Sequence, residues 1–90
     1  MGADLIAARA PTTPEVTDYD RAHLVTYLRL LDAEAAGAPW EEAARLLLAV
    51  DPGKGRDDAR LRYETHASRA RWMAASGYLG LLKAPTTRLT

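Results

Sequence analysis

Residues 29–48, RLLDAEAAGAPWEEAARLLL, are typical of one helix, an abrupt stop and a second helix. Gly37 predicts the end of the first helix, because glycine readily adopts the left-handed backbone that follows many last helical turns. Pro39 predicts the start of the second helix, because its fixed φ suits the first helical position and its missing N–H is not needed there. Two helices joined by so short a turn are typical of recognition modules and not of active sites.

Apolar residues recur at steps of three and four on both sides of this turn, which predicts further helices. The first helix begins near Asp18, with Thr17 as a suitable N-cap, and continues unbroken to Gly37. The second contains Leu46 and Leu48 beside its main apolar stripe, so we expect it to be buried on more than one side. The predicted helices span residues 18–36, 39–50, 57–76 and 78–83.

Each predicted helix has an apolar stripe that should face a common core. In the third helix Tyr63 and Trp72 are nine residues apart, about 180° around a helix, so both face one core only if the helix bends, for example near Thr65. The predicted core positions are Leu24, Tyr27, Leu28, Leu31 and Ala35 of the first helix, Trp40, Ala43, Ala44, Leu47 and Val50 of the second, and Ala59, Tyr63, Ala67, Ala70, Met73, Ala74 and Gly77 of the third.

The chain length allows one domain, since 90 residues are fewer than most single domains contain. The predicted fold is all-α, a compact helix-turn-helix variant of three to four helices with disordered tails. We expect residues 1–16 to form a flexible N-terminal tail, residues 17–84 the helical domain, and residues 85–90 a C-terminal tail.

The composition excludes most enzyme classes. The chain has no cysteine, and His23 and His66 stand without carboxylates at metal-ligand spacing, so we expect no metal site and no cofactor. Residues 51–57, DPGKGRD, lack the glycine spacing of a phosphate-binding loop, and no serine is paired with a base. We therefore expect no enzyme activity. The N-terminus lacks the basic and apolar regions of a signal peptide and no segment is long enough to span a membrane, which favours a cytoplasmic location.

The net charge of zero conceals an asymmetry along the chain. Residues 18–58 contain nine acids and five bases, a balance of −4, whereas residues 59–90 contain six bases and one acid, a balance of +5. Basic side chains along one helix are typical of contacts with DNA phosphates, although a solvated helix face gives the same pattern. The candidate DNA-binding residues are Arg60, Arg62, Arg69 and Arg71.

An aromatic residue on the third helix provides a second candidate site. Trp72 and Leu61 lie off the main core stripe, and tryptophan and arginine are frequent at the energetic centres of protein interfaces. The alternative is that Tyr78, Leu81 and Leu82 fold back and cover Trp72. For Trp40, at the start of the second helix, a core position is favoured. The candidate partner-binding residues are Leu61, Trp72, Tyr78 and Leu81, with Arg69 and Arg71 at the rim.

Several short sequences in order along residues 19–83 resemble the QseM-like antiactivator family. They are Leu31-Asp32-Ala33, Gly37-Ala38, Trp40, Gly77-Tyr78 and Leu81-Leu82. The resemblance implies a helix-turn-helix variant with an extra helix in place of a wing, found in regulators of proteobacterial integrative and conjugative elements. Longer members of that family carry the domain in DNA-binding activators. Short members block TraR-like quorum-sensing regulators of the LuxR type, and FseA-like activators, by protein contact.

Our interpretation of the sequence is a transcriptional antiactivator that binds and inhibits such activators. The long second turn, residues 51–56, and the absence of a net positive charge favour it over the alternative, a DNA-binding helix-turn-helix transcriptional regulator. A third interpretation is a toxin–antitoxin or scaffold subunit.

Overall fold

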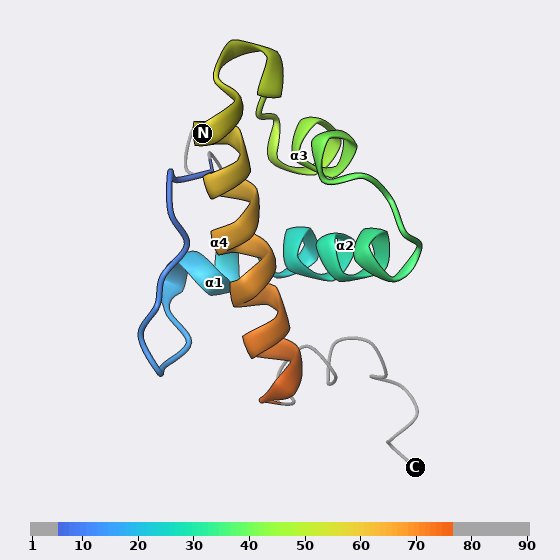
Figure 1. Ribbon diagram of the computed structural model, residues 1–90. Helices are drawn as coiled ribbons and strands as arrows, with labels where there is room; N and C mark the ends of the chain where they lie inside the picture. Colours follow the sequence, from blue (N-terminus) through green and yellow to red (C-terminus); the bar gives the residue numbers. More distant parts are fainter. Residues whose placement is uncertain (1–5, 77–90) are drawn as a thin grey trace.

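The computed structural model describes residues 6–76, and the regular structure in that range is entirely helical (Figure 1). This confirms the predicted all-α class. The predicted helix at residues 78–83 and the predicted C-terminal tail lie outside the described residues. None of the helices in residues 6–76 is long and apolar enough to cross a membrane. The elements are α1 (Asp18–Ala22), α2 (Leu24–Ala35), α3 (Trp40–Leu48), the 3-10 turn η2 (Pro52–Lys54) and α4 (Arg56–Ala75).

The chain breaks at His23, where the sequence predicted one continuous helix. Thr17 and Asp20 form a capping box, in which each side chain accepts the backbone N–H of the other, and this fixes the start of α1. At His23 the backbone leaves the helical conformation, with φ −117° and ψ 23°, and its N–H bonds back to the carbonyls of Tyr19 and Asp20. The prediction of a single helix was wrong here, because helical apolar spacing continues across the break. In Figure 1, α1 passes behind α4 and α2 continues on the other side.

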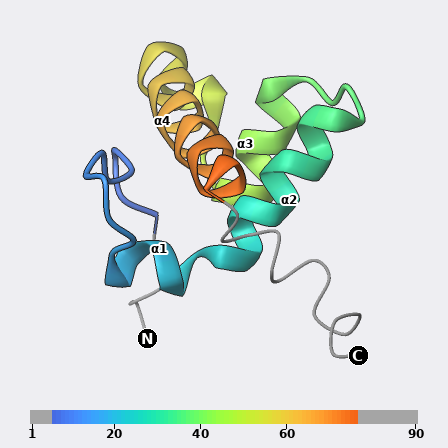
Figure 2. The ribbon, with the colours of Figure 1, turned by 90° about the horizontal axis from the view of Figure 1, so that it is seen from below.

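The core lies where α2 and α3 pack against α4, on one side of that helix (Figure 2). α4 is one helix without a break near Thr65, so Tyr63 faces the core and Trp72 lies beside it. On α3 the fully buried leucine is Leu48 and not the predicted Leu47, which is partly buried. The buried core residues are Tyr27 and Leu30 of α2, Ala43, Ala44 and Leu48 of α3, and Tyr63, Ala67, Ala70 and Met73 of α4.

Residues 6–17 are here called the strap, and most of them lie on the opposite side of α4 from α2 and α3 (Figure 2), while Ile6 and Val16 pack against the core. Ala10 is buried, and its N–H donates to Thr65 Oγ1 of α4 at 3.2 Å. The N–H of Ala7 donates to the hydroxyl of Tyr19 at 3.0 Å. The sequence predicted a flexible tail over residues 1–16, because the apolar residues there follow no period.

A buried histidine completes the link between strap and helices. His66 of α4 is fully buried, its Nδ1 lies 2.7 Å from the carbonyl of Arg62, and its Nε2 lies 2.6 Å from the Tyr19 hydroxyl. The carbonyl can only accept, so Nδ1 carries the proton and Nε2 accepts from Tyr19. Burial lowers the pKa of His66, although the hydrogen bond to Arg62 opposes this effect. The neutral ring is therefore a structural element of the packed interior.

Candidate nucleic-acid interface

The turn between α2 and α3 has the short, closed geometry that the sequence predicted. Gly37 has φ +78°, its N–H bonds to the carbonyl of Glu34, and the N–H of Ala38 bonds to the carbonyl of Ala33, each at 3.0 Å. These two hydrogen bonds are those of a Schellman motif, which satisfies the last carbonyls of a helix. Pro39 is extended and α3 begins at the next residue. In Figure 1, α2 is seen lengthwise and α3 nearly end-on, so the two helices cross steeply after a turn of residues 36–39.

The four candidate DNA-binding arginines do not share one face of α4. Arg60 and Arg71 lie on its exposed side, whereas Arg62 and Arg69 lie about 180° away from them. Each guanidinium is also paired with a carboxylate. The pairs are Arg60–Glu64 at 2.8 Å, Arg62–Asp58 at 2.8 Å, Arg69–Asp20 at 2.7 Å and Arg71–Glu34 at 2.6 Å. Within residues 6–76, α4 therefore has no continuous positive ridge.

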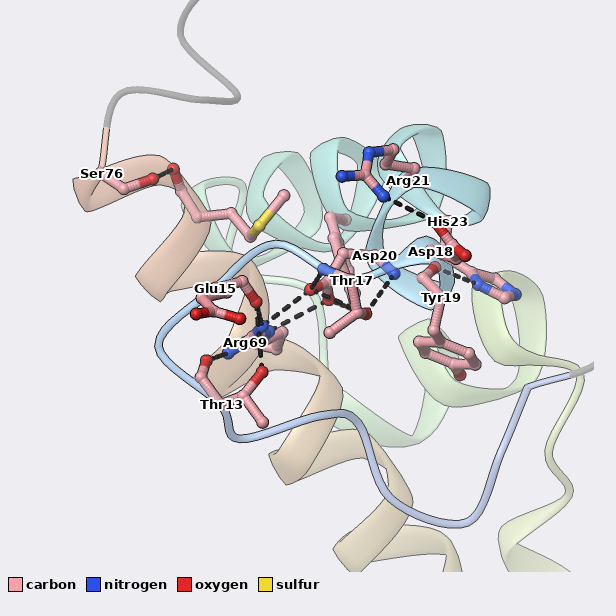
Figure 3. Close-up of polar contacts among 12 residues, drawn as sticks. Thr13, Glu15, Thr17, Asp18, Tyr19, Asp20, Arg21, His23, Arg69 and Ser76 are labelled. Carbon is pink, nitrogen blue, oxygen red and sulfur yellow. Dashed lines mark hydrogen bonds and ion pairs between the residues drawn. The ribbon is translucent and has the colours of Figure 1, made fainter.

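Arg69 has a structural role in place of the surface role that the sequence predicted. Its side chain is 4% exposed, and its guanidinium donates to both carboxylate oxygens of Asp20 and to the carbonyls of Thr13 and Glu15 (Figure 3). Arg69 is therefore buried and paired within the fold, which differs from the exposed position that the sequence predicted for it. No local pattern indicates a partner 49 residues away.

The electrostatics of this buried pair favour the charged forms. Burial alone would raise the pKa of Asp20, but hydrogen bonds from Arg69, Thr17 and Tyr27 outweigh burial and lower the pKa to about 2. The Tyr27 hydroxyl donates to Asp20 Oδ1 at 2.8 Å, and burial, followed by this hydrogen bond, raises the pKa of Tyr27. The pair and its neighbours therefore form a satisfied polar network that joins α1, α2, α4 and the strap.

The predicted partner-binding residues are only partly brought together. Three of them, Arg69, Arg71 and Trp72, line a groove of about 480 Å³ between the strap and α4, together with Pro11, Thr12, Glu64, Thr65 and Ser68. The Arg69 guanidinium lies 4.0 Å from the centre of the Trp72 ring. Leu61 is 41% exposed, but it lies 11 residues, about 16 Å along the helix, from Trp72 and outside the groove. Tyr78 and Leu81 lie outside the described residues.

Trp40 carries a cationic cluster that the sequence did not predict. The guanidinium carbons of Arg56 and Arg60 lie 5.1 and 5.0 Å from the centre of its ring, and the Tyr63 ring lies 6.0 Å away. Arg56 also pairs with Glu41 at 2.7 Å. Trp40, the first residue of α3, packs against the core as expected, and the guanidinium groups of Arg56 and Arg60 from α4 lie over its ring. The one available signal was the position of Arg56 and Arg60 one turn apart at the start of α4.

The described residues include no group of three or more histidine, cysteine, aspartate or glutamate side chains that could hold a metal ion. The polar groups that the structure brings together are ion pairs and hydrogen bonds of the fold.

A small helical core with two steeply crossing helices joined by a short turn is shared with the helix-turn-helix domains that recognise DNA. A family model described as "T6SS, Transcription factor, DNA binding domain", the RovC DNA-binding domain, matches residues 3–83. The chain belongs to this family. A comparison with curated proteins gave no match. The family supports a domain of a transcription regulator, and it favours the predicted DNA-binding alternative over the antiactivator.

Proposed function

We propose that this chain is a regulatory domain that binds duplex DNA. The observation that carries the proposal is the family match, which covers the strap and all of α1 to α4. The short Schellman turn between α2 and α3 supports it, because that turn sets the steep crossing by which helix-turn-helix domains present one helix to a groove.

The ion pairs of α4 are compatible with phosphate contacts. The Arg60 and Arg71 side chains are 51% and 47% exposed, and exposed ion pairs contribute only about 0–1 kcal/mol. Each guanidinium can therefore exchange its carboxylate for a DNA phosphate at small cost. Arg69 cannot, because its side chain is only 4% exposed and is paired with the buried Asp20. We infer a binding mode with few phosphate contacts, in keeping with the zero net charge.

The test is fluorescence anisotropy of a labelled mixed-sequence duplex, titrated with the protein at several salt concentrations. The wild type should bind at low salt, with log K falling linearly with log salt by about 0.9 for each phosphate contacted. Arg60→Ala and Arg71→Ala should each reduce that slope by about 1, and Ser68→Ala, an uncharged exposed change on the same helix, should leave it unaltered. An anisotropy that stays flat with wild-type protein at low salt would reject the proposal.

A second candidate function is the antiactivator, in which the domain binds and inhibits a transcription activator. The groove that contains Trp72 favours it, because a part-buried tryptophan beside Arg71 is a common anchor at protein interfaces. In this proposal the partners are TraR-like regulators of the LuxR type and FseA-like activators of conjugative transfer.

Calorimetric titration of a purified TraR-like or FseA-like activator tests this candidate. Trp72→Ala should weaken binding at least tenfold with unchanged helical circular dichroism, since the ring lies beside the core and not in it. Leu61→Ala, outside the groove, is the matched control. Equal affinity of Trp72→Ala and wild type would eliminate the groove as the contact surface.

A further inference from the structure

We propose that α3 is the helix that contacts the base edges, through Glu42, Arg45 and Leu46. This inference rests on the DNA binding proposed above and adds which helix enters the major groove. The sequence pointed instead to arginines of α4.

The three side chains share the outward face of α3. Its inward face is fixed by Ala43, Ala44 and Leu48, all at most 3% exposed. At about 100° per residue, positions 42, 45 and 46 lie on the opposite side of the helix. All three are exposed, and Leu46 is 72% exposed, the highest value among the exposed large hydrophobic residues of the described chain. The sequence assigned Leu46 to a widened core stripe, and this prediction was wrong.

These three residue types can contact base edges that lie close together in the major groove. An arginine guanidinium donates two hydrogen bonds to O6 and N7 of guanine, a glutamate carboxylate accepts from N4 of cytosine, and apolar side chains contact the methyl group of thymine. On α3, residues 42, 45 and 46 lie within little more than one helical turn. The set therefore matches direct readout in chemistry as well as in position.

Arg45 is available for such a contact in a way that the arginines of α4 are not. Within residues 6–76 it forms no ion pair, although Glu41 lies one turn before it on the same side of α3. Glu41 is instead paired with Arg56, which stacks over Trp40 together with Arg60. This arrangement places Arg56 and Arg60 beside the first turn of α3, where they can contact the phosphates that flank a groove.

The geometry around α4 is less suitable for entry into a groove. The strap lies beside the C-terminal half of its exposed side, where Pro11 and Thr12 face Ser68 and Trp72 across the groove. The turn that precedes α4 spans residues 49–55 and contains η2, whereas the turn before α3 spans residues 36–39.

The test begins with selection of preferred duplexes from a random-sequence library by the wild-type domain. Affinities of variants are then measured by anisotropy on the selected duplex and on a scrambled duplex. Arg45→Ala should lose roughly 5- to 150-fold on the selected duplex and much less on the scrambled one, as expected for the loss of one bidentate base contact. Leu46→Ala should reduce the same preference by a smaller factor.

Arg60→Ala is the matched control, because a phosphate contact should weaken both duplexes by the same factor. Circular dichroism should be unchanged for all three variants, since each changes an exposed side chain. The assignment of α3 would be overturned if the wild type bound DNA but selected no preferred sequence. It would also be overturned if Arg45→Ala and Leu46→Ala both kept the wild-type preference for the selected duplex over the scrambled one. Failure of the wild type to bind either duplex would instead reject DNA binding itself.

Discussion

Asp20 and Arg69 are 49 residues apart in the chain, yet they form a bidentate ion pair with N–O distances of 2.7 and 3.0 Å. Both side chains are nearly inaccessible to water, at 0% and 4% exposure. The same guanidinium binds the carbonyls of Thr13 and Glu15. One side chain of α4 therefore connects the strap and α1, neither of which belongs to the three-helix core.

Replacement of Arg69 by methionine should destabilise the domain strongly. Arg69→Met leaves the Asp20 carboxylate buried without its cation, which typically costs about 3–5 kcal/mol. Arg71→Met is the control, because the Arg71–Glu34 pair is about half exposed and should contribute at most about 1 kcal/mol. Urea unfolding followed by circular dichroism measures both. Similar losses for the two variants would contradict a structural role that is specific to Arg69.

The same pair predicts a loss of stability in acid. The pKa of Asp20 is about 2 in the fold against an ordinary 3.8, so its carboxylate stabilises the folded state above about pH 4. That contribution, about 2 kcal/mol, is lost as the pH falls through the folded pKa near 2. Urea midpoints between pH 5 and pH 2 measure it. The stability of Asp20→Asn should fall less than that of the wild type between pH 5 and pH 2, and the difference should equal the contribution of Asp20. An equal fall in both proteins would show that other carboxylates cause the loss.

Leu46 and Leu48 of α3 should differ sharply in their effect on stability. Leu48 is 2% exposed in the core, so Leu48→Ala should create a cavity and cost about 2–5 kcal/mol. Leu46 is 72% exposed, and Leu46→Ala should change the free energy of unfolding by less than about 0.5 kcal/mol. Thermal or urea unfolding of the two variants decides the matter. A large loss in Leu46→Ala would mean that this side chain is covered in solution.

Gly37 and Ala49 flank α3, and both have a left-handed backbone conformation. Exchange between glycine and alanine should change the free energy of unfolding in opposite directions at these two positions. Ala49 ends α3 with φ +57°, a conformation that strains a residue with a Cβ atom, so Ala49→Gly should stabilise by up to about 1 kcal/mol. Gly37 has φ +78° with nothing near an added Cβ atom, so Gly37→Ala should cost about 1 kcal/mol through backbone strain alone. Urea midpoints test the pair, and a shift of the same sign in both variants would contradict this account.

Features that depend on local backbone chemistry could be predicted from the sequence. The turn at residues 36–39 was predictable because Gly37 and Pro39 restrict the backbone wherever they occur. The core stripe of α4 followed from its helical period, apart from Ala74, which is exposed, and the predicted Gly77 lies outside the described residues. The break at His23 was not predictable, since the apolar spacing runs on across it and the bonds that end α1 are made by backbone groups.

The functional residues were harder to predict, because helical position does not reveal a partner. Arg69 and Arg71 are both arginines of α4, yet Arg69 is buried and paired with Asp20, which is distant in the sequence, whereas Arg71 is exposed. The strap is held through backbone carbonyls at Thr13 and Glu15, which any residue supplies. Leu46 is followed by two other leucines, and this apolar run led to the prediction that Leu46 lies in the core.

The attachment of the strap to Arg69 has a practical consequence for protein engineering. A chimera that joins another regulator to this domain at residue 17, the boundary expected from the helical pattern, would remove both carbonyls that the guanidinium binds and would uncover the side of α4 on which Ala10 lies. A graft that keeps its folded properties should therefore include the segment from residue 6 onward.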